Sequence, residues 1–183
     1  VTWNGVEDPV DVPVVDDGGD EPGTPVDPSD PSAIKVSIPQ TTYTLPDDVD
    51  KKAEAIATIT SEKGLKSMKV VIEAGNDGFG SVINDEDLIN NDCDFSKGVE
   101  FVGATDSSPV MRLIKVIAPN LKAPAAGATS YQFPLGEFFQ AVSIYKETKE
   151  EANGHVFKIR LEDNDGNVND ETVLSIIVKK TEE

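Results

Sequence analysis

A short run of oxygen-bearing side chains near the end of the chain has residue types and a spacing that could bind a metal ion. Asp163, Asp165 and Asn167 occupy alternate positions of the run DNDGN, and Asp170 follows three residues later. Carboxylate and amide oxygens at alternate positions, with a glycine for the bend, are part of the way an EF-hand loop holds Ca²⁺. The final glutamate and the two flanking helices of that loop are missing, and D-x-D-G runs also form ordinary turns. A calcium site and a ligand-free turn are therefore both open interpretations of this run.

The sequence contains few residues that could support nucleophilic or zinc-dependent catalysis. His155 is the single histidine and Cys93 the single cysteine, so a Ser-His-Asp or Cys-His mechanism would have to use them. His155 begins a predicted strand with no G-x-S-x-G motif beside it, and a zinc site needs three or four Cys or His ligands. We therefore expect a protein that is not an enzyme, with no cofactor unless calcium binds. A small glycosidase stays open as a further hypothesis, because some pair among the 34 acidic residues could lie at a suitable separation by chance.

Two tyrosines are candidates for stacking against a sugar ring. Glycan binding needs exposed aromatic platforms, because an aromatic ring supplies a large apolar surface with a polar tip. Tyr43 and Tyr131 both lie in loop-like contexts, whereas Tyr145 and most phenylalanines fall at predicted core positions. Tyr43 and Tyr131 are therefore the candidate glycan-binding residues.

The DNDGN run joins two predicted strands that form the last hairpin of the chain. Between Gly154 and Lys180, apolar and polar residues alternate on both sides of the run, which is the period of a strand with one buried face. Such an antiparallel pair needs a second sheet to cover its apolar side. We expect six side chains of this hairpin in the core: Phe157, Ile159, Leu161, Leu174, Ile176 and Val178.

Shorter strands are predicted upstream of the hairpin. Residues 34–38 alternate and stop at a proline, as suits an edge strand, and residues 52–61 are rich in small and β-branched side chains. A tight turn at 62–64 leads to a strand with Met68, Val70 and Ile72 on its apolar side. Three further stretches are expected to be a loop with a short extended piece, a flexible loop and a short strand, respectively: 42–50, 75–80 and 131–133.

Two short helices are predicted between these strands. Asn84 is expected to cap one that runs through Leu88, with acidic side chains at its positive end. Ser108 and Pro109 offer a capping hydroxyl and a proline at the first helical position for a second. The apolar residues that follow recur at spacings of three and four until Pro119, which predicts an amphipathic helix.

A third helix is predicted before the final hairpin. Its apolar residues also recur at helical spacing, and Gly154 lies where a glycine would end it. The residues on its apolar face are Leu135, Phe138, Phe139, Val142 and Tyr145.

The charge of the chain limits its partners. The net charge is −18, from 16 basic and 34 acidic residues. Such a field repels phosphate backbones and anionic lipid headgroups, so we expect neither nucleic-acid binding nor direct membrane binding. Divalent cations are the partners that acidity could attract, although solubility is the simplest explanation of the charge. The single cysteine excludes an intrachain disulfide.

The first 33 residues differ in composition from the rest. They contain nine acidic residues, six prolines and four glycines, and no Lys or Arg. Such a segment cannot bury enough apolar surface to offset the entropy of ordering. Residues 1–33 are therefore predicted to be a disordered acidic linker, and residues 34–183 a folded domain.

The order of these segments resembles a known kind of module. The chain carries GLKSMKVVIEAG, then NDEDLIN, SPVMRLIKVIAP, AGATSYQFPLGEFF and finally GHVFKIRLEDNDGN with LSIIV. This succession resembles the immunoglobulin-like domains, of unknown function, in surface lipoproteins of Bacteroides-type gut bacteria. The resemblance implies a mainly β fold, an antiparallel immunoglobulin-like β-sandwich with two or three short helices in its connections. It supplies no catalytic residues.

The resemblance also implies a location and a role. The acidic, proline-rich start is similar to the spacer that follows the lipidated cysteine of such proteins, so export and anchoring at the outer membrane or cell surface are expected. Membrane attachment would come only from a lipid upstream of this sequence. The expected function is a non-catalytic structural, adhesive or complex-forming module with a protein or glycan partner. A carbohydrate-binding module for glycan capture is the alternative, and the oligomeric state stays open.

Overall fold

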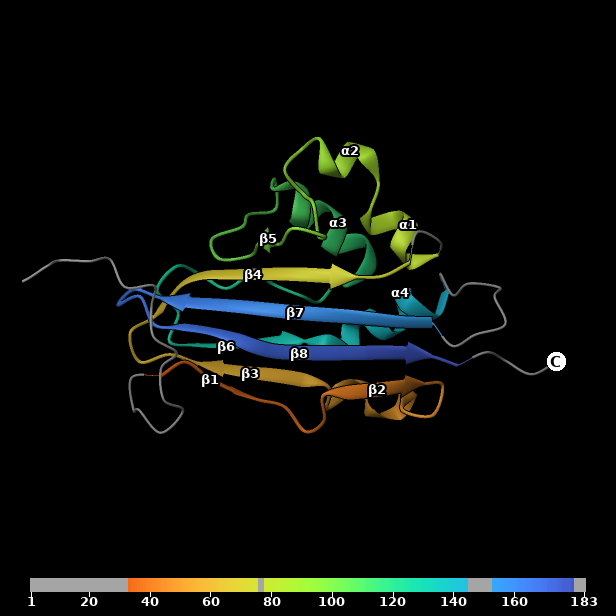
Figure 1. Ribbon diagram of the computed structural model, residues 1–183, viewed down its shortest axis with the longest axis horizontal. Helices are drawn as coiled ribbons and strands as arrows, with labels where there is room; N and C mark the ends of the chain where they lie inside the picture. The colour runs from red at the N-terminus through yellow and green to blue at the C-terminus, as the bar shows by residue number, and fades with distance from the viewer. Residues whose placement is uncertain (1–32, 76–77, 145–152, 180–183) are drawn as a thin grey trace, which may run out of the picture.

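The computed structural model describes residues 33–75, 78–144 and 153–179. Its strands form two sheets that lie one behind the other in Figure 1, with strand orders β1-β3-β6 and β2-β8-β7-β4-β5. The fold is therefore mainly β, as the alternating apolar residues predicted. The strands are β1 (Lys35–Ser37), β2 (Thr42–Leu45), β3 (Ile56–Thr60), β4 (Leu65–Glu73), β5 (Val99–Glu100), β6 (Ser130–Pro134), β7 (Asn153–Asp163) and β8 (Val168–Val178).

The final hairpin forms the centre of the larger sheet, as predicted. β7 pairs antiparallel with both β8 and β4, with Phe157 opposite Leu174 on one side and opposite Ile72 on the other. Because side chains alternate across a strand, one residue in two faces inward. All six predicted core residues of the hairpin are buried, and the most exposed of them, Val178, retains 7% of its surface.

The beginning of the domain is divided between the two sheets. β1 pairs antiparallel with β3, whereas β2 pairs parallel with β8, with Tyr43 opposite Ile176. The prediction of an antiparallel sandwich therefore agrees with the other strand pairs, whereas the β2–β8 pair is parallel. The stretch 42–50, expected to be mostly loop, holds β2 and the start of a 3₁₀ helix, η1 (Val49–Ala53). The next strand consequently begins at Ile56, later than the predicted residue 52.

Short helices occupy the connections around β5 and lie beyond the β4 edge of the larger sheet (Figure 1). They are α1 (Phe79–Ile83), α2 (Glu86–Ile89) and α3 (Pro109–Ile117). The predicted helix at Pro109 is confirmed, with Ile114 and Ile117 on its buried side. Ser108 precedes α3, but its hydroxyl does not cap the helix; it accepts a hydrogen bond from the backbone N–H of Thr105 at 3.0 Å.

The first helical prediction is wrong by one residue at its cap. Asp85, not Asn84, is the N-cap of α2, and its carboxylate accepts a hydrogen bond from the backbone N–H of Asp87 at 2.9 Å. Asn84 instead ends α1, which begins at Phe79 inside the stretch predicted to be a loop. Phe79 is fully buried, and this burial holds the short α1 in place.

The predicted third helix is shorter than expected. It consists of a 3₁₀ turn, η2 (Leu135–Glu137), followed by α4 (Phe138–Ile144), and residues 145–152 lie outside the described part of the chain. Gly154 does not end a helix but lies within β7, opposite Ile177. The predicted linker likewise lies outside the described residues up to position 32, and Ala33 is already buried.

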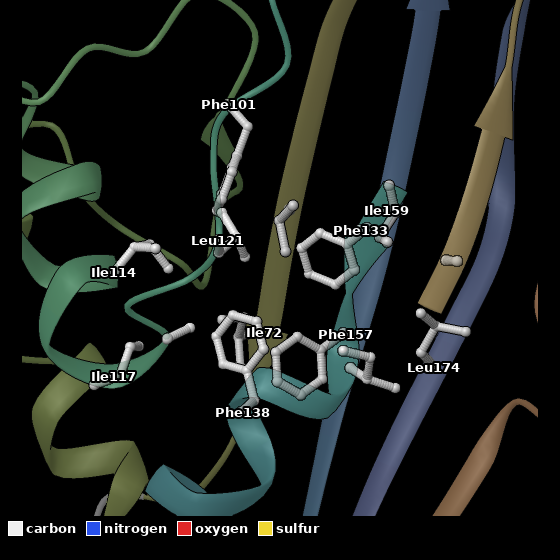
Figure 2. Packing of buried hydrophobic residues seen from close by; sticks show 14 of the residues in the cluster. Ile72, Phe101, Ile114, Ile117, Leu121, Phe133, Phe138, Phe157, Ile159 and Leu174 are labelled. Carbon is white, nitrogen blue, oxygen red and sulfur yellow. The ribbon is translucent and has the colours of Figure 1, made fainter. Parts of the chain in front are cut away.

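The core joins both sheets and the helices through a group of phenylalanines. Phe133 of β6 stacks on Phe138 of α4 with ring centroids 5.9 Å apart, and Phe138 meets the edge of Phe157 on β7 at 5.0 Å. Figure 2 shows these three rings together, with Ile114 and Ile117 of α3 reaching toward them from the side. The helices thus cover the end of the core that the sheets leave open.

Candidate functional site

The loop between β7 and β8 is organised around the buried carboxylate of Asp163. Asp163 is fully buried, and its Oδ1 accepts hydrogen bonds from the backbone N–H groups of Asp165 and Asn167, both at 2.9 Å. Its Oδ2 accepts a third from Nδ2 of Asn167 at 2.8 Å. The backbone N–H of Asp163 donates to the carbonyl of Asn167 at 3.0 Å. One carboxylate with three donors therefore closes the loop from inside, in the manner of an Asx turn.

A second set of contacts joins this loop to the turn between β3 and β4. Asn164 donates from its backbone N–H to the carbonyl of Gly64 and from Nδ2 to the carbonyl of Lys63, both at 3.0 Å. The Nζ of Lys63 lies 3.5 Å from a carboxylate oxygen of Asp165. Gly64 has φ 79°, and a Cβ there would lie 2.6 Å from the carbonyl oxygen of Gly127. Three turns therefore meet at this end of the molecule.

The structure brings only part of the predicted calcium set together. Asp163 and Asn167 are hydrogen-bonded to each other, Asp165 faces Lys63, and Asp170 is an exposed residue of β8 outside this network. In the described part of the chain, no three His, Cys, Asp or Glu side chains are grouped so as to hold a metal ion. Three hydrogen bonds already use most of the acceptor positions of the Asp163 carboxylate, and Asp165 and Asp170 are not gathered around it to complete a calcium site. The geometry thus favours the structural turn.

The two tyrosines predicted to form a glycan platform have different positions. Tyr43 is 1% exposed, and its ring lies 5.3 Å from that of Phe139, so its prediction as an exposed platform is wrong. The cause is β2, whose alternation turns Tyr43 inward; burial also raises the pKa of its phenol. Tyr131 is half-buried against the core, and its hydroxyl donates to the carbonyl of Lys122 at 2.6 Å. Neither ring stands free on the surface.

The single histidine and the single cysteine both belong to the interior. His155 is fully buried on β7, with its Nδ1 3.2 Å from the carbonyl oxygen of Ile176 and its ring against the edge of Phe79 at 5.5 Å. Cys93 is 1% exposed, and burial raises the pKa of its thiol to about 11. The thiolate, which is the nucleophilic form, is therefore scarce at neutral pH.

Glu100 of β5 organises the edge of the larger sheet, a role that sequence analysis missed. Its Oε1 accepts hydrogen bonds from the backbone N–H groups of Met68 at 2.8 Å and Val102 at 2.9 Å, and its Oε2 accepts one from the Ser67 hydroxyl. These bonds lie where the β4–β7 pairing shifts register between Leu65 and Ser67. The sequence feature that could have indicated this role of Glu100 is an acidic residue within the otherwise apolar run VEFV.

Asp48 is a second carboxylate with a structural role. It accepts a hydrogen bond from the backbone N–H of Thr44 at 2.7 Å, and its other oxygen lies 2.7 Å from Nζ of Lys51. The hydrogen bond from Lys51, followed by that from Thr44, lowers the pKa of the Asp48 carboxyl. This cluster fixes the turn that follows β2.

A shallow hollow of about 230 Å³ lies at the start of the domain. Ser61 lines it and is 1% exposed, although its hydroxyl has no hydrogen-bond partner among the described protein atoms. The residues around the hollow are Ala33, Lys35, Thr60, Ser61, Glu62 and Thr129. The hollow is open to solvent, so it offers room for several water molecules or a small polar group rather than for an enclosed ligand.

Comparison with protein-family models, with curated protein sequences and with solved structures gave no match. None of the helices in the described residues is long and apolar enough to cross a membrane.

Proposed function

We propose that this chain is a non-catalytic, immunoglobulin-like module of an exported cell-surface lipoprotein, with a structural, adhesive or complex-forming role. The order of strands in the two sheets is the observation that carries the proposal. Because fold alone does not determine function, the positions of the candidate catalytic side chains are considered separately as support for a non-catalytic role.

The strand order supports the proposed immunoglobulin-like fold when the strands receive the letters of that fold. With β3, β4, β5, β6, β7 and β8 as B, C, C′, E, F and G, strands B and E share one sheet and C′, C, F and G the other. The divided first strand fits too: β1 lies beside B, and β2 runs parallel to G. The departure is at strand D, where the described chain between β5 and β6 carries α3.

The positions of His155 and Cys93 favour a role without catalysis. A general base or nucleophile must reach the substrate within hydrogen-bond distance. Both side chains are at most 1% exposed, and the Cys93 thiol has a raised pKa. They serve packing here, and the chain has no second histidine or cysteine.

The composition of the first 33 residues supports a surface location. An acidic, proline-rich segment of this length can span about 100 Å when extended, at ~3.3 Å per residue, and its charges repel one another toward extension. Such a spacer would hold the domain away from a membrane to which an upstream lipid is attached. The alternative of glycan capture gains no support from Tyr43 or Tyr131, and we keep it as an outcome of the test below.

Protease treatment of intact cells tests the proposal. In the source organism, we expect added protease to digest the protein on intact cells as completely as in lysed cells, and a radiolabelled fatty acid to enter the full-length gene product. Protection in intact cells together with release in the soluble fraction would overturn the surface assignment.

The partner class is tested separately, by cross-linking on cells and by electrophoresis of the purified protein. Chemical cross-linking on living cells is expected to capture a discrete protein complex, whereas affinity electrophoresis against a panel of polysaccharides is expected to show no retardation. Retardation by a polysaccharide, without a cross-linked protein, would replace the complex-forming role with glycan capture.

A further inference from the structure

The first and last strands of the described domain run in the same direction along its long axis. The carbonyl of Ile34 accepts a hydrogen bond from Nδ2 of Asn169, near the start of β8, at 3.2 Å. Leu45, at the end of β2, lies opposite Val178 at the end of β8. Figure 1 shows β1 and the arrowhead of β8 at opposite ends of the long axis. A pull that separates Ala33 from Lys179 therefore acts along the strands.

The parallel β2–β8 pair lies on the path of such a pull. Its register extends from Thr42 opposite Ser175 to Leu45 opposite Val178. The backbone N–H of Ser175 donates to the carbonyl of Thr41 at one end, and that of Lys179 donates to the carbonyl of Leu45 at the other, both at 2.8 Å. A pull on β2 toward its start and on β8 toward its end makes the two parallel strands slide past each other. Sliding strains all the hydrogen bonds of the ladder at once.

Buried side chains of β2 resist the same sliding. Tyr43 and Leu45 are 1% and 2% exposed, and the ring of Tyr43 lies 5.3 Å from that of Phe139. Because interiors are close-packed, a displaced side chain has no empty space to enter. A slip by one residue would also turn both side chains away from the core. β2 is therefore held by packing as well as by its ladder.

The turn after β2 is fastened to β2 and to the end of β8. The carboxylate of Asp48 accepts a hydrogen bond from the backbone N–H of Thr44 at 2.7 Å, and the backbone N–H of Asp48 donates to the carbonyl of Thr44 at 2.8 Å. The Nζ of Lys179 forms an ion pair with the carboxylate of Asp47. These contacts hold the end of β2 beside the last residues of β8.

The neighbouring strands transfer the load to the core. β1 pairs with β3 from Lys35 opposite Thr60 to Ser37 opposite Thr58, so a pull on Ala33 also slides β1 along β3. On its other side β8 pairs with β7 over a longer ladder than with β2. The β2 ladder is consequently the weaker of the two that hold β8, and it sets the resistance to the pull.

We propose that this domain bears mechanical tension between its two ends and that the parallel β2–β8 pair is the element that resists it. The inference rests on the proposed function, in which a lipid upstream holds one side of the module and a partner holds the domain. Tension arises whenever that partner moves relative to the cell surface. The acidic spacer would then act as the tether that transmits the tension.

Single-molecule force spectroscopy of the full chain, pulled in two directions, tests the proposal. The first sample carries Asp47→Ala and has DNA handles at both ends of the chain, so that β2 and β8 slide. The second carries Asp47→Cys, with one handle on this cysteine and the other at the C-terminal end, so that β2 is peeled from β8 one hydrogen bond after another. Both samples lack the ion pair of Asp47 with Lys179. Cys93 takes no handle, because it is 1% exposed.

The two samples are compared at the same constant force. We expect the first to stay folded at least ~10-fold longer than the second, because ~1–2 net hydrogen bonds change a barrier by about this factor. Equal lifetimes, or a longer lifetime in the peeling direction, would overturn the proposal. The measurement uses purified protein, so either result leaves the surface location to the protease experiment on intact cells.

A pair of variants at one position identifies the ladder as the source of the resistance. Lys179→Pro removes the N–H that donates to the carbonyl of Leu45, whereas Lys179→Gln keeps this N–H and removes only the ion pair with Asp47. Val178 is already in a strand, the conformation that a following proline favours. With handles at both chain ends, the proline variant should unfold ~5–10-fold faster than the glutamine variant, while amide spectra verify that both are folded. Equal lifetimes of the two variants would show that the β2–β8 ladder does not bear the load.

Discussion

Replacing Asp163 with alanine is expected to destabilise the domain strongly, although the loop that contains Asp163 is largely exposed. The substitution removes the acceptor of three hydrogen bonds, two of them from backbone N–H groups. A hydrogen bond to a charged group contributes ~1.5–3 kcal/mol. Water can replace part of this loss at the exposed Asp165, so we expect a total of about 3 kcal/mol.

The expected loss is measurable by thermal unfolding. For a folded domain of 150 residues (34–183), 1 kcal/mol corresponds to ~2–4 °C in Tm, so the variant should melt ~6–12 °C below the parent. Asp170→Ala is the matched control, because Asp170 is an exposed acidic residue seven positions further on. That control should remain within ~0.5 kcal/mol of the parent. If the two variants melt together near the parent, Asp163 does not hold the loop as described.

Four further predictions follow from individual residues. Gly64→Ala should lower the free energy of unfolding by ~2 kcal/mol or more, and the control Gly103→Ala by about 1 kcal/mol. Both glycines have positive φ, but only at Gly64 would a Cβ clash with Gly127. Equal losses for the two variants in urea unfolding would contradict the close approach. Cys93 should react with a thiol reagent at neutral pH only on unfolding, since it is buried with a pKa of about 11; rapid reaction of native protein would refute its burial. Millimolar calcium should leave Tm unchanged, because in the described residues Asp163 is not part of a group of three acidic, His or Cys side chains that could hold a metal ion; a rise of several degrees would restore the calcium site. The pKa of the Asp48 carboxyl is lower in the folded than in the unfolded state, so the carboxylate stabilises the fold above the unfolded pKa, and this stabilisation is lost as pH falls through the folded pKa. Lys51→Met should raise the titration midpoint of Asp48 measured by NMR. An unchanged midpoint would count against the ion pair.

Long periodic segments are what the sequence predicted well. The hairpin with Phe157 and Leu174 and the helix with Ile114 and Ile117 each repeat their period often enough to identify element and buried face. Four-residue β2 has too few repeats to be distinguished from a loop, so the inward position of Tyr43 was missed. Asn84 and Asp85 are adjacent cap formers of similar preference, and sequence alone could not choose between them.

The details of the candidate site depend on tertiary contacts. The run DNDGN indicated a turn, but which aspartate points inward follows from the meeting of three turns around Gly64. The hydrogen bonds of Glu100 to Ser67 and Met68 follow from the pairing of β4 with β5, which links residues more than 30 positions apart. Neither arrangement can be predicted from residues that are close together in the sequence.

The arrangement of the divided first strand is the premise of the proposed function, and cross-strand nuclear Overhauser effects measure it most directly. The account predicts contacts of a parallel ladder between Thr42–Leu45 and Ser175–Val178, together with antiparallel contacts between Val36 and Ile59. Antiparallel contacts between residues 42–45 and β8, or pairing of these residues with β3, would contradict the proposed immunoglobulin-like fold.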